Sequence, residues 1–455
     1  MLPDFDHPLI LRKQPPYPAI DPNKLVGIHN GVNALFANTG LDPLNPFRHW
    51  IQPGMRVLVK PNWVRHAAED WSVLEALITH TSILRPVVEL VARALTNSKG
   101  SIEGEIILAD APLQSANFEL LLTQSAITPL LLDWHARSIP VHLRDLRRVI
   151  AETDESTGVV QSSREAPGDA SGDTVVDLAT ESRLEELLDG RHHFGVSNYD
   201  SSTTSSHHSP GVHRYRIANS LLDSDVVINL PKWKTHVKTG VTGALKNFIG
   251  INCDKAYLPH FRVGPPCRGG DEYPDSFAGD LLARIRPWFE RVMPGEVIRS
   301  ARKSLLASRQ RSNAPLVFGG AWPGNDTLWR TIHDMVFIAR WLGPNGVKLS
   351  SPRPILTLLD AVVAGEGDGP LRPQPRDMGC LLFGTDPGQI DLFATALSGF
   401  DWHQVPALAH LTDPAAAAIT RFKPTTPMPE PELLLMPPAA WAASLPLKEP
   451  AYEAA

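Results

Sequence analysis

Two apolar stretches, Met55-Arg-Val-Leu-Val-Lys60 and Glu105-Ile-Ile-Leu-Ala-Asp110, decide the fold of this chain. Each has the length and the β-branched content of a buried strand, and turn residues bound the first. Between them, apolar residues from Ser82 to Leu95 recur at helical spacing, and Pro86 falls near the first turn, where proline is tolerated. Strand, helix and strand over this length form a βαβ unit, so we expect a parallel sheet.

Further core segments follow later in the chain. We expect strands at 225–230, 354–360 and 380–384, and helices at 277–293, 328–342 and 389–397. The sequence therefore predicts an α/β protein whose mostly parallel sheet is flanked by helices and interrupted by a long polar insertion.

Composition divides the chain into five segments. They are an N-terminal extension (1–54), a first α/β half (55–150), a polar insertion (151–215), a second α/β half with a basic motif (216–412) and a Pro/Ala-rich tail (413–455). We expect the insertion to be partly loop, with one helix near Glu181–Leu188. After Phe422 we expect a poorly packed tail.

Bulk composition narrows the class of protein. A chain of 455 residues exceeds one ordinary core, and its 43% apolar and 20% charged residues are typical of a globular protein. The net charge of -6 disfavours nucleic acid as a partner. Because no apolar run is long enough for a membrane span and the first residues lack the apolar core of a signal peptide, we expect a cytoplasmic protein without membrane association.

The three cysteines, Cys253, Cys267 and Cys380, are widely spaced and form no CxxC pair. An iron–sulfur cluster normally needs four thiolates, so no intrinsic iron–sulfur cluster is expected. Free thiols in a reducing compartment are the favoured interpretation.

The segment 231–250 is the most informative for chemistry: Pro-Lys-Trp-Lys-Thr-His-Val-Lys-Thr-Gly-Val-Thr-Gly-Ala-Leu-Lys-Asn-Phe-Ile-Gly. It contains four lysines and one histidine, and no acidic residue. If its first part is extended, four side chains share one face: Lys232, Lys234, His236 and Lys238. Their positive charges would repel one another, and a bound anion would relieve that repulsion. The segment also follows the C-terminal end of a predicted strand, where α/β sheets bind ligands.

Two glycines and a helix start support an anion site. Gly240 and Gly243 permit close backbone approach, and a helix is expected to begin near Thr242, where its free N–H groups would add positive potential. Lys246 would lie in the second turn, where a desolvated lysine can act as a base or nucleophile. His236 is the other candidate acid or base. The alternative is a solvated basic strand edge that discourages aggregation.

Acidic residues form a second cluster. Asp110 and Asp360 each end a predicted strand, and Glu366 and Asp368 lie in the following Gly-rich loop. Carboxylates at strand ends can meet in one cleft, where these four would hold Mg²⁺ or orient the lysines. The alternative is that each acid serves a turn or a helix cap. The sequence has no Walker lysine motif, dinucleotide fingerprint or serine nucleophile elbow.

Several motifs occur in an order that resembles the domain-of-unknown-function family 362. They are Val57-Leu-Val-Lys-Pro-Asn62, Ala109-Asp110, Asp225-Val-Val-Ile-Asn-Leu-Pro-Lys-Trp-Lys-Thr-His236, Thr242-Gly-Ala-Leu-Lys-Asn247, Asp360-Ala-Val-Val-Ala-Gly-Glu-Gly-Asp-Gly-Pro370 and Thr385-Asp-Pro387 with Asp391. The resemblance covers residues 55 to 412. It supports the fold and the location of the site, and it names no reaction.

The resemblance also adds residues to the expected site. On these motifs, Lys60, Asn62 and Asn247 join the expected substrate-binding residues, and so does His260, which precedes a motif of a family subset. Many members of the family look iron–sulfur linked through an additional ferredoxin-like cysteine domain. This chain departs from that pattern, which puts an intrinsic electron-transfer role in doubt.

These features predict an enzyme that acts on a small molecule bearing phosphate or carboxylate groups. We expect Lys232, Lys234 and Lys238 to bind the anion, and His236 or Lys246 to move a proton or attack the substrate. The alternative is a non-catalytic anion-binding protein, or a redox-accessory protein that borrows an iron–sulfur cluster from a partner.

Overall fold

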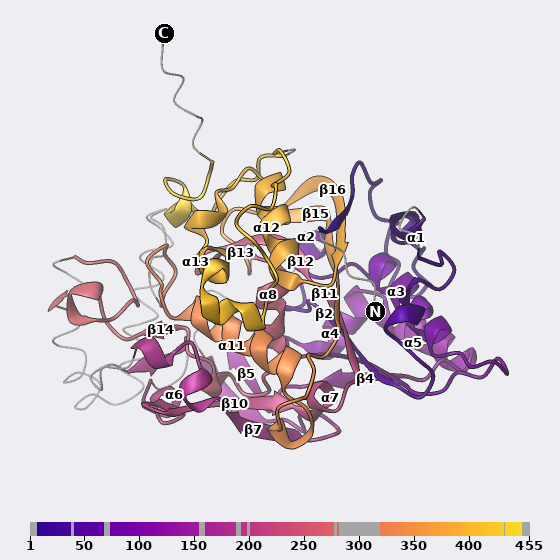
Figure 1. Ribbon diagram of the computed structural model, residues 1–455, viewed down its shortest axis with the longest axis horizontal. Coiled ribbons are helices and arrows are strands. Elements are labelled where there is room, and N and C mark those ends of the chain that lie inside the picture. The colour runs from indigo at the N-terminus through magenta and orange to yellow at the C-terminus, as the bar shows by residue number, and fades with distance from the viewer. Residues whose placement is uncertain are drawn as a thin grey trace, which may run out of the picture.

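The computed structural model describes residues 7–37, 41–67, 73–153, 160–187, 193–197, 201–276, 280–281, 319–431 and 433–447. A large mixed sheet runs through the molecule, with helices on both of its faces (Figure 1). The predicted α/β class is therefore confirmed. Most of the predicted helix at 277–293 lies outside the described residues.

The central sheet has the strand order β1-β16-β15-β11-β2-β3-β4. Its strands are β1 (Leu9–Leu11), β2 (Arg56–Pro61), β3 (Glu105–Asp110), β4 (Val141–Asp145), β11 (Val226–Leu230), β15 (Ile355–Glu366) and β16 (Gln374–Gly384). Neighbours from β4 to β15 are parallel, whereas β16 is antiparallel to both β15 and β1. A hairpin of β12 (Lys232–His236) and β13 (Gly240–Thr242) extends the sheet beyond β11, because β12 also pairs with β15.

Helices cover the two faces of the sheet. One face carries α1 (Asn30–Phe36), α3 (Thr81–Ala94), α4 (Phe118–Gln124) and α5 (Ile127–Ala136), and the other carries α8 (Ala244–Asn247), α11 (Leu328–Trp341), α12 (Pro387–Leu397) and α13 (Pro406–Ala409) (Figure 1). Each face of the sheet has its own hydrophobic core. Within β2, Val57 and Val59 pack in the core on the side of α3, and Leu58 packs in the core on the side of α11, because successive side chains of a strand point to opposite faces. Among the described residues, no helix combines the length and apolarity needed to cross a membrane.

The order of the strands in the sheet changes direction at the boundary between β2 and β11. Strands β2, β3 and β4 follow one another toward one edge, and the chain then returns to place β11 on the other side of β2. The carboxyl ends of β2 and β11 therefore lie at a topological switch point, where open α/β sheets bind their ligands. Lys60 lies at the first of these ends and Lys232 just beyond the second.

The polar insertion contains more strand than the sequence predicts. It holds β5 (Val149–Thr153), β6 (Val160–Glu165), β7 (Asp173–Asp177), β8 (Phe194–Gly195), α6 (Ser201–Ser205), β9 (His208–Ser209) and β10 (Val212–Ala218). The helix expected near Glu181–Leu188 is wrong, since two short 3-10 turns occupy Ala179–Glu181 and Glu185–Leu187. In β10 the alternate residues Tyr215 and Ile217 are buried. The side chains on one face of this strand therefore hold it against the core, although the composition of the segment is typical of a loop.

The tail is packed through residue 447, which contradicts the expected poor packing after Phe422. Leu435, Trp441 and Leu445 are buried, and the indole Nε1 of Trp441 donates to the carbonyl oxygen of Val237 at 2.8 Å. These three side chains anchor the segment, and Met428 and Leu433 pack partly buried against the same core.

Candidate functional site

Strand β12 places three basic side chains on one face. Lys232, Lys234 and His236 alternate with Trp233, which packs on the opposite side and donates from Nε1 to Ser398 Oγ at 2.8 Å. Lys232 and Lys234 are both 0% exposed. The predicted extended segment is therefore confirmed from Lys232 to His236, whereas Lys238 lies in the turn after the strand. The alternative of a solvated strand edge is wrong, because the strand is buried.

Lys232 is held by a buried acid and a tyrosine. Its Nζ lies 3.2 Å from Asp360 Oδ2 and donates to the hydroxyl of Tyr17 at 2.6 Å. Tyr17 in turn donates to Asp360 Oδ1 at 2.5 Å and stacks on the ring of His80, with 3.9 Å between centroids. Burial lowers the pKa of Lys232, and Asp360 opposes that effect. The charge of Lys232 is therefore balanced inside the protein by Asp360.

Lys60 forms a second buried ion pair. Its Nζ lies 2.7 Å from Asp110 Oδ1, and Asp110 also accepts the backbone N–H groups of Trp63 at 2.7 Å and Ala111 at 2.9 Å. Burial lowers the pKa of Lys60 and raises that of Asp110, while each partner counteracts the effect on the other. A Cβ added at Gly250 would lie 2.1 Å from Asp110 Oδ1, so only glycine lets the backbone pass this close to the pair.

Neutral oxygens and amides connect Lys234 to the rest of the site. Its Nζ donates to Asn62 Oδ1 at 2.7 Å and to the carbonyl oxygen of Leu77 at 2.5 Å. Asn62 Nδ2 donates to Asn247 Oδ1 at 2.9 Å, and Asn247 Nδ2 donates to Asn229 Oδ1 at 2.8 Å. This network links β2, β11, β12 and α8, so the structure does bring together the predicted residues of these segments.

The start of α8 does not offer its N–H groups to a ligand. The backbone N–H groups of Ala244 and Leu245 donate to the carboxylate of Asp391, at 2.5 and 2.9 Å. A Cβ added at Gly243 would lie 2.0 Å from Asp391 Oδ1, so this glycine serves the carboxylate contact. The prediction that the helix N-terminus adds to an anion site is therefore wrong. Burial raises the pKa of Asp391 to about 7.

Lys246 differs from the lysines of β12. Its side chain is partly exposed and forms no hydrogen bond or ion pair with any residue that the structure describes. Burial, followed by the positive charges of Lys255 and Lys60, lowers the pKa of Lys246 to about 8. A much larger fraction of this amine is neutral at physiological pH than of an ordinary surface lysine.

Lys246 and five basic side chains near it form a group that we call the basic cluster: Lys234, His236, Lys238, Lys246, Lys255 and His260. After burial, the charge of Lys246 is the largest cause that lowers the pKa of His236, and it also contributes to the lowering at Lys234 and His260. The leading causes at His236 and Lys246 are burial and the positive charges of neighbouring basic side chains, and the same causes lead at His260. The neighbouring lysines thus add to the effect of burial and lower the pKa of both histidines and of Lys246.

Two lysines of the basic cluster converge on one serine. The Nζ of Lys238 donates to Ser197 Oγ at 3.0 Å, and the Nζ of Lys255 donates to the carbonyl oxygen of Ser197 at 3.4 Å. Lys238 also lies over the ring of Phe261, 5.8 Å from its centroid. The sequence prediction named Lys238 but missed Lys255 and Ser197.

The two histidines of the cluster have opposite tautomers. His236 Nδ1 accepts the backbone N–H of Lys238 at 3.0 Å, so the neutral ring carries its proton on Nε2. His260 Nδ1 lies 2.8 Å from the carbonyl oxygen of Leu258 and must donate to it, which leaves Nε2 unprotonated. Burial and nearby lysines hold the pKa of both rings well below the usual value. One ring therefore presents a proton donor and the other a proton acceptor.

The four predicted metal ligands do not come together. Asp110 and Asp360 are in the ion pairs described above, and Glu366 and Asp368 each accept a backbone N–H from the C-terminal segment, both at 2.9 Å. Within the described part of the chain, no group of three or more His, Cys, Asp or Glu side chains is arranged to hold a metal ion. The expected shared Mg²⁺ site is corrected accordingly. Asp110 and Asp360 each contact a lysine, as expected if these acids orient the lysines, whereas Glu366 and Asp368 bind backbone N–H groups.

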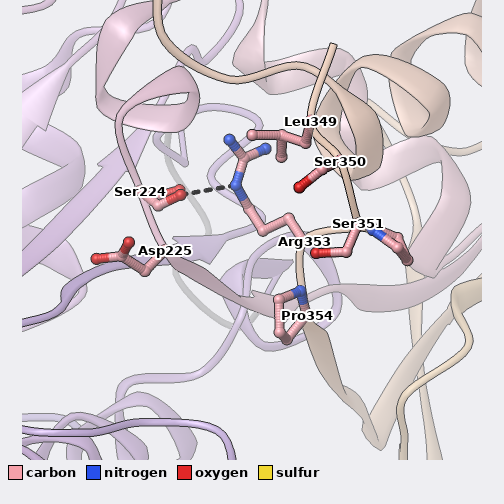
Figure 2. A pocket seen from close by; sticks show the side chains of 8 residues that line it. Ser224, Asp225, Leu349, Ser350, Ser351, Arg353 and Pro354 are labelled. Carbon is pink, nitrogen blue, oxygen red and sulfur yellow. Dashed lines mark hydrogen bonds between the residues drawn. The ribbon is translucent and has the colours of Figure 1, made fainter.

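A depression of about 180 Å³ lies at the other end of the sheet, before β11 and β15 (Figure 2). It contains Arg353, whose Nε donates to the carbonyl oxygen of Ser224 at 2.7 Å. The same guanidinium donates to the carbonyl oxygens of Leu222, Ala339 and Leu342. With its donors occupied by the ends of α7 (Asn219–Leu222) and α11, Arg353 joins two helices and leaves no anion site here.

Comparison with known proteins places these features in a family. The family model described as "Domain of unknown function (DUF362)" matches residues 140–396, more than half of the chain, so the chain belongs to this family. The match includes β12 and α8 and begins after Lys60 and Asp110. A search of the curated proteins found no match.

One solved structure is similar at a distance. It is a structural genomics crystal structure of a protein from Thermotoga maritima, with 12% sequence identity and a TM-score of 0.27. The alignment covers 77% of this chain and 53% of that one, so this chain spans about half the length of its relative. A likeness of this degree does not bear on the chemistry of the site.

Proposed function

We propose that this protein is an enzyme that binds a small phosphate- or carboxylate-bearing molecule at the basic cluster. Lys238 and Lys255 would hold the anionic group, and Lys246, His236 and His260 would carry out the chemistry. Lys60 and Lys232, whose charges are already balanced, would support the site without touching the ligand.

One observation carries the proposal: Lys246 has no hydrogen bond or ion pair with any residue that the structure describes, and it lies among basic side chains near the switch point of the sheet. Neighbouring positive charges destabilise a folded chain, because two unit charges a few ångströms apart repel by a few kcal/mol near a protein surface. A bound anion would offset that repulsion. The opposite tautomers of the two histidines then suit acid and base roles.

Calorimetric titration tests the binding step. Inorganic phosphate and malonate would be titrated into the full chain at constant ionic strength, against the Lys246→Met variant and the Lys99→Met variant, in which an exposed lysine is removed. We expect Lys246→Met to weaken binding by about tenfold and Lys99→Met to leave it unchanged. Equal, weak binding by all three proteins would overturn the proposal. A coloured protein with stoichiometric iron would instead support the redox-accessory alternative.

A further inference from the structure

The backbone that carries Lys246 is fixed on both sides. The two preceding N–H groups donate to Asp391, and the side chain of Asn247 donates to the carbonyl oxygen of Lys60 at 3.3 Å and to Asn229 Oδ1 at 2.8 Å. The Lys246 side chain is nevertheless partly exposed and has no partner among the described residues. A fixed backbone with a reachable, unengaged amine is the arrangement that a nucleophile needs.

We infer that Lys246 forms a Schiff base with an aldehyde or ketone that also carries a phosphate or carboxylate group. This inference rests on the proposed function, because the anionic group of the substrate would occupy the same basic cluster. It goes further by assigning a covalent role to one residue and a carbonyl group to the substrate.

The other lysines of the site are less suited to this role. Lys234 is fully buried and donates to two oxygens, and Lys60 and Lys232 are fully buried in ion pairs. Lys238 and Lys255 donate to Ser197. Lys246 is the lysine whose neighbours favour the neutral amine and whose nitrogen lacks such contacts within the described structure.

The reaction needs no external oxidant or reductant. The lone pair of the Lys246 amine forms a C–N bond to the carbonyl carbon, and the carbonyl oxygen gains a proton. The carbinolamine then loses this oxygen as water, while the two amine hydrogens supply the water hydrogens. The Nε2–H of His236 would donate to the departing oxygen, and the unprotonated Nε2 of His260 would accept a proton from nitrogen.

Reductive trapping tests the inference. The full chain would be incubated with glycolaldehyde phosphate, glyoxylate or neutral glycolaldehyde, each with cyanoborohydride, and the labelled lysine would be located by peptide mass spectrometry. We expect one label per chain at Lys246, at roughly tenfold lower concentration for an anionic aldehyde than for glycolaldehyde. The more efficient of the two anionic aldehydes identifies phosphate or carboxylate as the preferred group.

Competition and matched variants complete the test. Inorganic phosphate should protect Lys246, Lys246→Met should remove the specific label, and Lys99→Met should leave it unchanged. Scattered labelling of surface lysines, equal for charged and neutral aldehydes, would overturn the Schiff-base role. If calorimetry still shows phosphate binding that depends on Lys246, the anion site stands without the covalent step. If it shows none, both proposals fail.

Discussion

The ammonium group of Lys60 lies 2.7 Å from the carboxylate of Asp110, and both side chains are almost fully buried. They come from neighbouring parallel strands, β2 and β3. Removing one partner of such a pair leaves an uncompensated buried charge, whereas replacing both with apolar groups removes the problem.

We therefore expect Lys60→Met to lower the free energy of unfolding by about 3–5 kcal/mol. The double variant Lys60→Met/Asp110→Leu should regain most of that loss, as measured by urea denaturation. A double variant no more stable than the single one would show that the pair has a further role in the fold.

The lowered pKa of Lys246 predicts a pH dependence of stability. Its folded value of about 8 lies below the ordinary value of 10.5, so the unfolded chain binds more protons between these two pH values. The free energy of unfolding should gain a contribution that rises as pH increases from 8 to 10. In Lys246→Met this contribution should be absent, and stability near pH 7 should be equal or higher. Parallel curves for the two proteins would contradict the prediction.

The raised pKa of Asp391 predicts that the free energy of unfolding falls, rather than rises, with increasing pH in a lower pH range. Its folded pKa of about 7 is above the ordinary value of 3.8, so the folded chain binds more protons between these values. This carboxyl should therefore reduce stability progressively as pH rises from 4 to 7. In Asp391→Asn, chemical denaturation across this interval should show a shallower decline. An unchanged slope would mean that the carboxyl ionises normally in the folded protein.

The hydroxyl of Tyr17 can be tested separately from its ring. Tyr17→Phe keeps the stacking on His80 but removes the group between Lys232 and Asp360, and should cost about 1–3 kcal/mol of unfolding free energy. Tyr17→Leu loses the stacking as well and should cost more. Thermal denaturation that ranks Tyr17→Phe as the less stable of the two would contradict this account.

The packed tail provides a further test. Trp441→Ala should cost about 3–5 kcal/mol, since it removes a fully buried indole. Leu434→Ala is the matched control, because that side chain is 70% exposed and its loss should change stability by less than about 0.5 kcal/mol. Similar midpoints of denaturation for both variants would show that the tail does not stabilise the folded protein.

Local patterns predicted the sheet well because its central strands are buried on both faces. The apolar runs that predicted β2, β3 and β11 end within one residue of the observed strands. The predicted helices at 328–342 and 389–397 likewise correspond to α11 and α12. The insertion was harder to predict, because the buried face of β10 includes His213 beside Tyr215 and Ile217, and a buried histidine hides the alternation of apolar residues.

The sequence predicted which segments contribute basic side chains to the site, but not which of the lysines are paired with acids. Sequence spacing placed four side chains on one face, and the structure confirms this for Lys232, Lys234 and His236. The fourth, Lys238, lies in the turn after the strand. Nothing in the local sequence indicates that Asp110 balances Lys60 across 50 positions, or that Tyr17 reaches Asp360 across 343. Such pairings depend on the tertiary packing of the strands. They distinguish Lys60 and Lys232, which are paired with acids, from Lys246, which has no such partner within the described structure.

The contacts of Tyr17 and Trp441 also have a consequence for folding during translation. Tyr17 touches the partner of Lys232, and Trp441 donates to the turn that closes the β12–β13 hairpin. During translation, the hairpin emerges from the ribosome about two hundred residues before Trp441 can reach it. Nascent chains should therefore carry an unfinished hairpin until Trp441 has emerged, and fragments that lack Tyr17 or Trp441 should not reproduce these contacts.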